Sequence, residues 1–464
     1  MSQAKVTHSP TTSHKPAKTR DMTTGTIWKH IILFALPLLV GNLFQQLYNS
    51  VDSIIVGNFV SKQALAAVGS TGPVINTLVG FFMGMSTGAG VLISHYFGKK
   101  DDKGLHEAIH TTVLLTLLLC VVFTAIGILM VPFMVRFMKT PADVVEESTQ
   151  YLRIYFAGVS GLMLYNMGSG ILRAVGDSKR PLYFLCISSV VNIVLDLVFV
   201  VVFHMGIAGV ALATVISQIV SAILVLLVLT KTDDVYKLTW KDLHLSPHIL
   251  RRVCVIGIPA GLQMAVTSFS NVFVQSYINN FGSACMAGWT SYSKIDQCVL
   301  LPMQSLSMSA TTFVGQNIGA GQMKRAGEGR KIALRIALLV TVSLTVILWI
   351  AAVPAIRLFT PEEDVLRYGT IFLRFMSPFY VCCCFNQITA GALRGMGDST
   401  GPMVIMLSCF VVFRQLYLAV MTRLIGGIYV VAFAYPAGWI LCSLCMSIYY
   451  RRKVRKQPET RPAA

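Results

Sequence analysis

The feature that most constrains this chain is a series of twelve apolar runs, each long enough to cross a lipid bilayer. A helix of about 20 apolar residues spans the hydrocarbon core. Hydrophobic residues make up 55% of the 464 residues and charged residues 12%. We therefore expect an all-α polytopic membrane protein, with spans near 30–57, 64–95, 109–137, 146–174, 181–204, 207–230, 248–280, 283–317, 329–358, 364–394, 401–424 and 427–450.

The second half of the chain repeats the first. Segment 170–181, which contains Leu-Arg-x-x-Gly-Asp-Ser and ends in Pro, returns 221 residues later as segment 391–402. Glycine ends a helix and Asp or Ser caps the next one, so we interpret this motif as a structural turn. Each half holds six spans, an even number, so both halves run the same way through the membrane. We predict two six-helix lobes related by a pseudo-two-fold axis along the membrane normal.

The predicted domain limits follow from this repeat and from two polar ends. The N-lobe comprises residues 30–230 (spans 1–6) and the C-lobe residues 248–450 (spans 7–12), joined by a cytoplasmic linker at 231–247. Residues 1–29 lack a cleavage site for a signal peptide and are interpreted as a disordered cytoplasmic tail. Residues 451–464 form a basic tail.

The basic residues predict the orientation in the membrane. With the N-terminus in the cytoplasm, 28 of the 38 Lys and Arg residues fall in cytoplasmic tails, loops and helix ends. Cytoplasmic loops are enriched in these residues, so both termini are expected on the cytoplasmic side of the plasma membrane. The same distribution accounts for the net charge of +18 without a nucleic-acid partner.

The eleven cysteines show neither a disulfide framework nor a metal-binding pattern. Most are scattered through apolar runs, where cysteine behaves as a small hydrophobic residue. We expect no metal beyond a coupling Na⁺ and no cofactor.

Three of the twenty acidic residues lie within predicted spans and away from the span ends: Asp52, Asp196 and Asp296. A carboxylate at the centre of a membrane helix costs about 2.5–3.5 kcal/mol on insertion scales, so such residues usually handle ions or substrates. Asp52 and Asp196 belong to the first lobe, and the equivalent second-lobe positions are Val274 and Tyr417. The acids are therefore not needed for the shared scaffold.

Polar residues surround both first-lobe acids. Gln45, Asn49 and Asp52 share a helix face, as do Asn192 and Asp196. Counted from the outer helix ends, Thr214 lies at a similar depth, and Tyr151 and Asn166 are candidates to join the cluster. Two carboxylates in a low dielectric hold a proton, or hold a hard cation among oxygen ligands. The competing interpretation is that the Asn and Thr groups only bind helices to one another.

The second lobe carries Lys294, Asp296 and Arg414 inside its spans. We consider them with Met264, Trp289 and Tyr292 as a candidate substrate cavity, in which soft and aromatic side chains adapt to varied ligands. Arg414 is one candidate partner for Asp296. Two other interpretations remain open: a buried structural ion pair, and apolar side chains that face lipid or neighbouring helices.

Over residues 25–450 the chain resembles the MATE (multidrug and toxic compound extrusion) family. The resemblance rests on the twelve spans, the doubled lobe, the repeated Leu-Arg-x-x-Gly-Asp-Ser and three short motifs. The short motifs are Asn49-x-x-Asp52, Asn192-Ile-Val-Leu-Asp196 and Val314-Gly-Gln-Asn-x-Gly-Ala-Gly321. The first-lobe acids make it similar to the DinF-like branch, since span 7 has no acidic residue.

This resemblance implies a monomeric antiporter that uses H⁺ or Na⁺ to expel small, amphiphilic, cationic drugs through alternating access of its lobes. It is thus not expected to be an enzyme. By the resemblance, Asp52, Asn192, Asp196 and Thr214 match the cation-coupling site, and Gln45, Asn49, Tyr151 and Asn166 match its polar surround. The second lobe departs from the pattern by carrying Lys294 and Arg414. The alternative function is a flippase for lipid-linked precursors in the same superfamily.

Overall fold

The computed structural model describes residues 20–138 and 140–456. Of the predicted tails at 1–29 and 451–464, residues 1–19 and 457–464 lie outside the described residues. The first half of the described chain is built from α1 (Ile27–Phe59), α2 (Lys62–Lys99), α3 (Asp102–Phe137), α4 (Val145–Ala157), α5 (Val159–Ala174), α6 (Lys179–Asp196), the π-helical segment η1 (Leu197–Val202) and α7 (Gly206–Lys231).

After a linker with the short helix η2 (Trp240–Asp242), the second half follows the same plan. It consists of α8 (Pro247–Asn279), α9 (Ser283–Gly319), α10 (Met323–Ile350), α11 (Ala352–Arg357), α12 (Glu363–Met376), η3 (Ser377–Phe379), α13 (Tyr380–Gly395), α14 (Thr400–Leu407), the π-helical η4 (Ser408–Phe413), α15 (Arg414–Leu424) and α16 (Ile428–Lys456). All twelve predicted spans are helical, which confirms the all-α class. Five of them are divided into two or more helical segments, such as α4 and α5.

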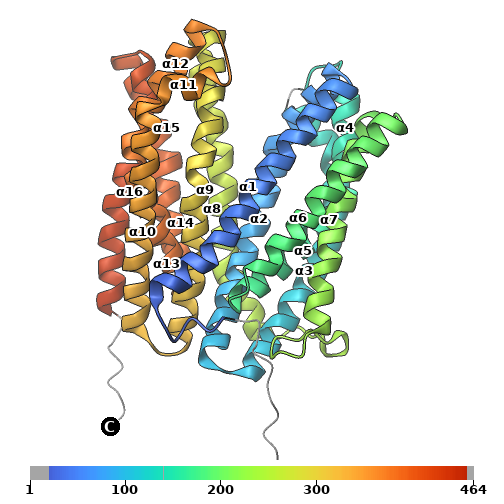
Figure 1. Ribbon diagram of the computed structural model, residues 1–464, viewed down its shortest axis with the longest axis vertical. Coiled ribbons are helices and arrows are strands. Elements are labelled where there is room, and N and C mark those ends of the chain that lie inside the picture. Colours follow the sequence, from blue (N-terminus) through green and yellow to red (C-terminus); the bar gives the residue numbers. More distant parts are fainter. Residues whose placement is uncertain (1–19, 139, 457–464) are drawn as a thin grey trace, which may run out of the picture.

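The helices form two bundles that meet at one end and diverge toward the other (Figure 1). The bundles meet at the end of the molecule where α1 begins and α16 ends. We call this end the terminal face. The opposite end is the far face. Helices α1–α7 build the first lobe and α8–α16 the second.

Two seams join the lobes, and they differ in chemistry. Along α2 and α8 the backbones touch at glycines: a Cβ on Gly84 would lie 2.1 Å from the Gly261 nitrogen, and one on Gly88 would lie 2.3 Å from the Gly257 Cα. Such small-x-x-x-small spacing lets membrane helices approach closely. The seam between α1 and α9 is polar instead. Across it Asn42 donates to Ser305 (3.4 Å), Gln46 to Gln297 (2.9 Å) and Ser309 to Ile31 O (3.0 Å).

At the terminal face, two hydrogen bonds related by the repeat cross from lobe to lobe. The His95 ring Nε2 contacts Gly395 O at 2.7 Å, and Gln316 Nε2 donates to Ala174 O at 2.9 Å. His95 and Gln316 stand 221 residues apart, as do Ala174 and Gly395. The lobes are therefore fastened here by pseudo-symmetric contacts.

The segment just before α1 covers this junction. Met22 is fully buried, its backbone N–H donates to Gln316 Oε1 (3.0 Å), and Arg325 Nη2 donates to Met22 O (3.2 Å). Residues 20–26 are thus held in place, contrary to the expectation of a disordered tail up to residue 29, and α1 begins at Ile27. Backbone groups in this segment find partners on α9 and α10, which composition alone does not reveal.

The repeated Gly-Asp-Ser motif forms the predicted helix cap in both lobes. Gly176 and Gly397 adopt positive φ angles of 87° and 83°. Asp177 Oδ1 then accepts from the Arg180 N–H (3.1 Å), and Asp398 Oδ1 accepts from the Gly401 N–H (3.0 Å). The structural interpretation of the motif is confirmed for its glycine and its aspartate in both lobes.

Candidate functional site

A cavity with a volume of about 1240 Å³, including its open mouth, lies within the first lobe. Side chains of α1, α2, α4, α5, α6 and α7 line it. Along α1 it extends from Pro37 to Asp52, a helix length of about 22 Å at 1.5 Å per residue. Six of the eight residues predicted for the cation site and its surround line this cavity: Gln45, Asn49, Asp52, Tyr151, Asn166 and Thr214.

The other two predicted residues, Asn192 and Asp196, lie behind Asp52. Asp52 is half-buried at the cavity wall, whereas Asn192 is 1% exposed and Asp196 is 0% exposed. Asp52, Asp196 and Asn192 lie close enough for their polar groups to interact electrostatically. The structure thus brings two carboxyl groups and one amide together, with one acid facing the cavity and the other enclosed.

These enclosed groups have unused hydrogen-bonding capacity. Both Asp196 oxygens, both polar atoms of Asn192 and Asp52 Oδ1 are buried without a hydrogen bond of complete geometry. A buried unpaired polar atom costs about 1–3 kcal/mol, so proteins rarely keep several together unless they bind something. Oxygen atoms from two acids and an amide suit a proton or a hard cation such as Na⁺.

Local backbone structure places Asp196 at this point. Asp196 is the last residue of α6 and is followed at once by the π-helical segment η1 (Leu197–Val202). A π-helical turn widens the helix by one residue and is frequent at functional sites. Thr214 on α7 is 8% exposed, and its hydroxyl donates to Val210 O (3.0 Å), so its oxygen keeps free lone pairs toward the cavity.

Of the six residues predicted for a second-lobe cavity, four lie in one connected group and two lie elsewhere. Tyr292 contacts both Asp296 and Trp289, and Arg414 joins them through the ring of Tyr435, which also lies against Trp289. Lys294 is exposed and lines a different pocket near the far face, where its Nζ lies 5.6 Å from the centre of the Phe359 ring. Met264 packs against Gly80 of α2, at the seam between the lobes. Trp289 lies in an aromatic cluster, 5.1 Å from Tyr292 and 5.0 Å from Phe372 between ring centres.

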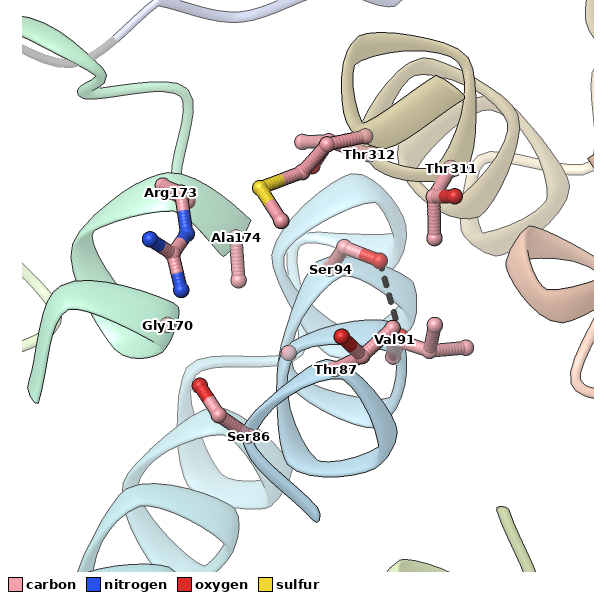
Figure 2. A pocket seen from close by; sticks show the side chains of 11 residues that line it. Ser86, Thr87, Val91, Ser94, Gly170, Arg173, Ala174, Thr311 and Thr312 are labelled. Atoms are coloured by element: carbon pink, nitrogen blue, oxygen red, sulfur yellow. Dashed lines mark hydrogen bonds between the residues drawn. The ribbon is translucent and has the colours of Figure 1, made fainter. Parts of the chain in front are cut away.

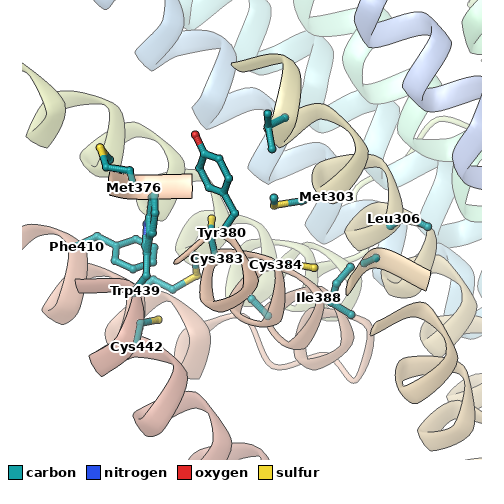
Figure 3. Packing of buried hydrophobic residues seen from close by; sticks show 14 of the residues in the cluster. Met303, Leu306, Met376, Tyr380, Cys383, Cys384, Ile388, Phe410, Trp439 and Cys442 are labelled. Atoms are coloured by element: carbon teal, nitrogen blue, oxygen red, sulfur yellow. The ribbon is translucent and has the colours of Figure 1, made fainter. Parts of the chain in front are cut away.

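Asp296 is bound by two tyrosines. Its Oδ1 accepts from Tyr380 (2.6 Å) and from Tyr292 (3.0 Å), and the two hydroxyls are 3.1 Å apart. Tyr380 is fully buried and packs among Met376, Cys383 and Trp439 (Figure 3). This acid is therefore part of a satisfied and tightly packed network.

The expectation that Arg414 pairs with Asp296 is wrong. Arg414 Nη2 donates to Ser270 (2.8 Å) and Asn271 (2.9 Å), and its guanidinium lies 4.6 Å from the centre of the Tyr435 ring. Helix α8 thus supplies the polar partners and α16 the aromatic face. Sequence spacing could not identify them because they come from helices distant along the chain.

Several cavity residues escaped the sequence analysis. Tyr48, Asn76, Tyr155 and Gln218 line the first-lobe cavity, and so does Arg173 of the repeated motif. For Arg173 a signal existed: it is a charged residue inside a predicted span, one residue before its end. The motif was interpreted only as a turn, so this arginine was not considered as a cavity residue.

One group of possible metal ligands lies at the start of α3, where His106, His110 and Asp242 come within 4.8 Å of one another. The Nδ1 of His110 contacts His106 O (2.7 Å), so it carries the proton, and its Nε2 accepts from the Thr239 N–H (3.0 Å). Both ring nitrogens are therefore occupied, and the group suits a structural role better than a metal site.

Two six-helix lobes, with a polar cavity and enclosed acids in the first lobe, define a membrane transporter. A family model for MatE matches the chain twice, at residues 37–198 and 259–421. The chain therefore belongs to the MATE family of multidrug efflux transporters, whose members are not enzymes.

Known relatives agree with this assignment. The chain is 30% identical over 438 residues to "Probable multidrug resistance protein YpnP" of Bacillus subtilis, which covers 94% of this chain and 97% of that protein. It is 29% identical over 463 residues to "Probable multidrug resistance protein YoeA" of the same organism, with 97% and 99% covered. The fold matches a solved transporter of the MOP superfamily from Pyrococcus furiosus with a TM-score of 0.89 at 24% identity, covering 95% of this chain and 99% of that one. These findings do not favour the flippase alternative.

Proposed function

We propose that this protein is a cation-coupled antiporter that uses an inward flux of H⁺ or Na⁺ to expel amphiphilic, cationic drugs. The observation that carries the proposal is the Asp52–Asp196 pair, in which one carboxyl faces a large cavity and the other is enclosed with unpaired oxygens. By its first-lobe acids, we assign the chain to the DinF-like branch.

The geometry suggests how the coupling ion and the drug compete. Two neighbouring carboxylates repel each other in a low dielectric, so a proton or Na⁺ between them lowers the energy of the pair. Asn192 and Thr214 supply the further oxygen atoms that a bound Na⁺ requires. Once the ion is bound, Asp52 offers less negative charge to a cationic drug in the cavity, and the drug is released.

The direction of transport follows from the proposed orientation. We place the terminal face on the cytoplasmic side of the plasma membrane, because the loops at this end carry most of the Lys and Arg residues. The lobes are fastened at this end by His95 and Gln316 and diverge at the far face. The structure then represents an outward-facing state of a monomer. Helix α1, which Pro37 deprives of one backbone hydrogen bond, is the element we expect to bend.

Transport by purified protein in liposomes tests this proposal. Ethidium flux is measured under an imposed pH gradient, then under a sodium gradient, and then with neither. We expect one of the two gradients to drive flux in the wild type, and Asp196→Asn to remove that dependence. An Asp196→Asn variant that still concentrates ethidium at the wild-type rate would overturn the coupling role of the pair.

A further inference from the structure

Arg173 is a charged side chain in the cavity for which the proposed ion coupling has no use. It lies one residue before the end of α5 and lines the cavity together with Pro37, Pro181 and Ser221. These residues mark the floor of the cavity, the end nearest the terminal face. Because side chains on a helix lean toward its N-terminus, and α5 runs toward the terminal face, Arg173 leans up into the cavity.

No described carboxylate forms an ion pair with Arg173. Among titratable groups of the described residues, Tyr165 is the one that interacts with it. Arg173 is partly exposed, and it lines both this cavity and the smaller pocket beside it. A guanidinium carries five N–H donors, which makes Arg173 a strong donor group in the lining of this cavity.

Two hydroxyl groups of the floor donate to backbone carbonyls: Tyr165 to Pro181 O (3.1 Å) and Ser221 to Gln218 O (2.8 Å). Asn166 uses one of its two amide N–H donors on Leu162 O (2.9 Å). Arg173 is the one cationic side chain in the described lining of this cavity. A negatively charged group would therefore be attracted to the Arg173 end.

The equivalent residue of the second lobe differs. Arg394, 221 residues later, is 6% exposed, and its Nη1 is directed at Gln263 Oε1 (3.5 Å). Arg394 lines neither the first-lobe cavity nor the smaller pocket that also touches Arg173. The turn motif alone thus does not require an arginine that faces open space.

A second, smaller pocket also touches Arg173 but suits an anion less well. Figure 2 shows the Arg173 side chain across from Thr311 and Thr312 of α9, with Ser86 and Ser94 of α2 between the lobes. Ser86 donates to Asn166 O (2.7 Å), Ser94 to Val91 O (2.8 Å) and Thr311 to Gly391 O (2.9 Å). These hydroxyls present lone pairs to the pocket, and its volume of about 320 Å³ is a quarter of that of the larger cavity.

We propose that Arg173 binds the carboxylate of zwitterionic amphiphilic substrates at the floor of the first-lobe cavity. The cationic end of such a ligand then points along α1 toward Asp52. This inference rests on the proposed efflux function and adds to it one residue that distinguishes ligands by their carboxylate. Opposite charges at the two ends of one cavity would orient a zwitterion, whereas a purely cationic drug would use the acidic end alone.

Equilibrium binding with a matched pair of ligands tests this proposal. Norfloxacin carries one carboxylate, and its ethyl ester carries none. Isothermal titration calorimetry on the full-length protein in detergent measures the ratio of their dissociation constants. We expect the wild type to bind the acid about tenfold more tightly, as one charge-assisted hydrogen-bonded contact allows. Arg173→Gln should bring the ratio close to one, and the control Arg394→Gln should leave it unchanged.

Two results would overturn the proposal: equal affinity of the wild type for acid and ester, or an unchanged ratio in Arg173→Gln. If Arg173→Gln fails to fold, the wild type and Arg173→Lys still decide, since lysine keeps the charge and should keep most of the preference. Ion coupling is judged separately, because ethidium flux that ignores both gradients would refute the coupling while leaving the binding ratio intact.

Discussion

The two lobes share a scaffold and differ in how they treat buried charge. Ser86 donates to Asn166 O and Ser307 to Gln387 O, both at 2.7 Å and related by the 221-residue repeat. The inter-lobe bonds of His95 and Gln316 obey the same relation. The backbone and its packing are thus nearly duplicated, whereas the acids within the membrane-spanning helices are not.

In the first lobe the acids have too few partners, and in the second lobe the acid has enough. Asp196 is enclosed with both oxygens unpaired, while Asp296 accepts two tyrosine hydroxyls. The difference teaches that an acid inside a membrane helix is not by itself evidence of ion handling. What separates a binding group from a structural one is whether the fold has already satisfied it.

The largest effect should come from exchanging an acid for its amide in each lobe. Asp52→Asn removes a charge that faces the cavity, so we expect ion-driven ethidium flux to fall about 100-fold, equivalent to about 2.7 kcal/mol. Asp296→Asn keeps an oxygen that accepts from Tyr292 and Tyr380, so flux should stay within about threefold of the wild type. Initial rates in liposomes at equal protein content measure both.

The comparison of lobes fails if Asp296→Asn loses transport to the same extent as Asp52→Asn. Thermal unfolding of both variants in detergent serves as the control. It shows whether a loss of flux reflects a lost charge or a damaged fold.

The seams between the lobes give the second test. A methyl group on Gly88 would lie 2.3 Å from the Gly257 Cα, and backbone atoms cannot move aside cheaply. Gly88→Ala should therefore push α2 from α8 and destabilise the protein by about 1–3 kcal/mol, the usual cost of overpacking. Gly69→Ala on the same helix has open space around its Cβ and should be neutral or stabilising.

Melting temperatures in detergent check this prediction. Equal melting temperatures for the two variants would show that the glycine seam tolerates separation. The α2–α8 contact would then be no more rigid than the polar α1–α9 contact.

Much of the fold could be predicted from sequence because its causes are local or periodic. Apolar runs of sufficient length predict helices, and one repeated motif predicts the duplication of six spans. Helical spacing and similar depth in the membrane made a cluster of Asp52, Asn192 and Asp196 geometrically possible, and the family resemblance selected these residues as the cation site. That α1 and α6 adjoin is a matter of helix packing, which the spacing does not give.

What could not be predicted depends on contacts between distant segments. The partners of Asp296 and Arg414 come from helices that the sequence does not order in space. Met22 is buried because α9 and α10 offer it hydrogen bonds, while its neighbours in sequence suggested a disordered tail. Arg173 was assigned from the sequence to a turn motif. The turn was predicted correctly, but the place of Arg173 in the cavity lining was not predicted.

The smallest expected effect concerns the repeated turn at the terminal face. Asp398 accepts from Tyr449 (2.6 Å) and pairs with Lys453 (2.8 Å), both on α16, whereas Asp177 of the first lobe pairs with Arg180 of its own turn (3.3 Å). Burial raises the pKa of the Asp398 carboxyl, but Lys453, Tyr449 and the Gly401 N–H outweigh it and hold the pKa below its ordinary value.

A lowered carboxyl pKa stabilises the fold above the unfolded-state pKa of about 3.9, and this stabilisation is lost as the pH falls through the lower folded-state value. Asp398→Asn should therefore cost about 1 kcal/mol or less at pH 7, because Lys453 is partly exposed. The difference in unfolding temperature between the variant and the wild type should shrink as the pH falls toward and below the folded-state pKa. Asparagine keeps the oxygen that accepts from the Gly401 N–H, so a difference that stays undiminished at acidic pH would mean that Asp398 does not stabilise the fold through its charge.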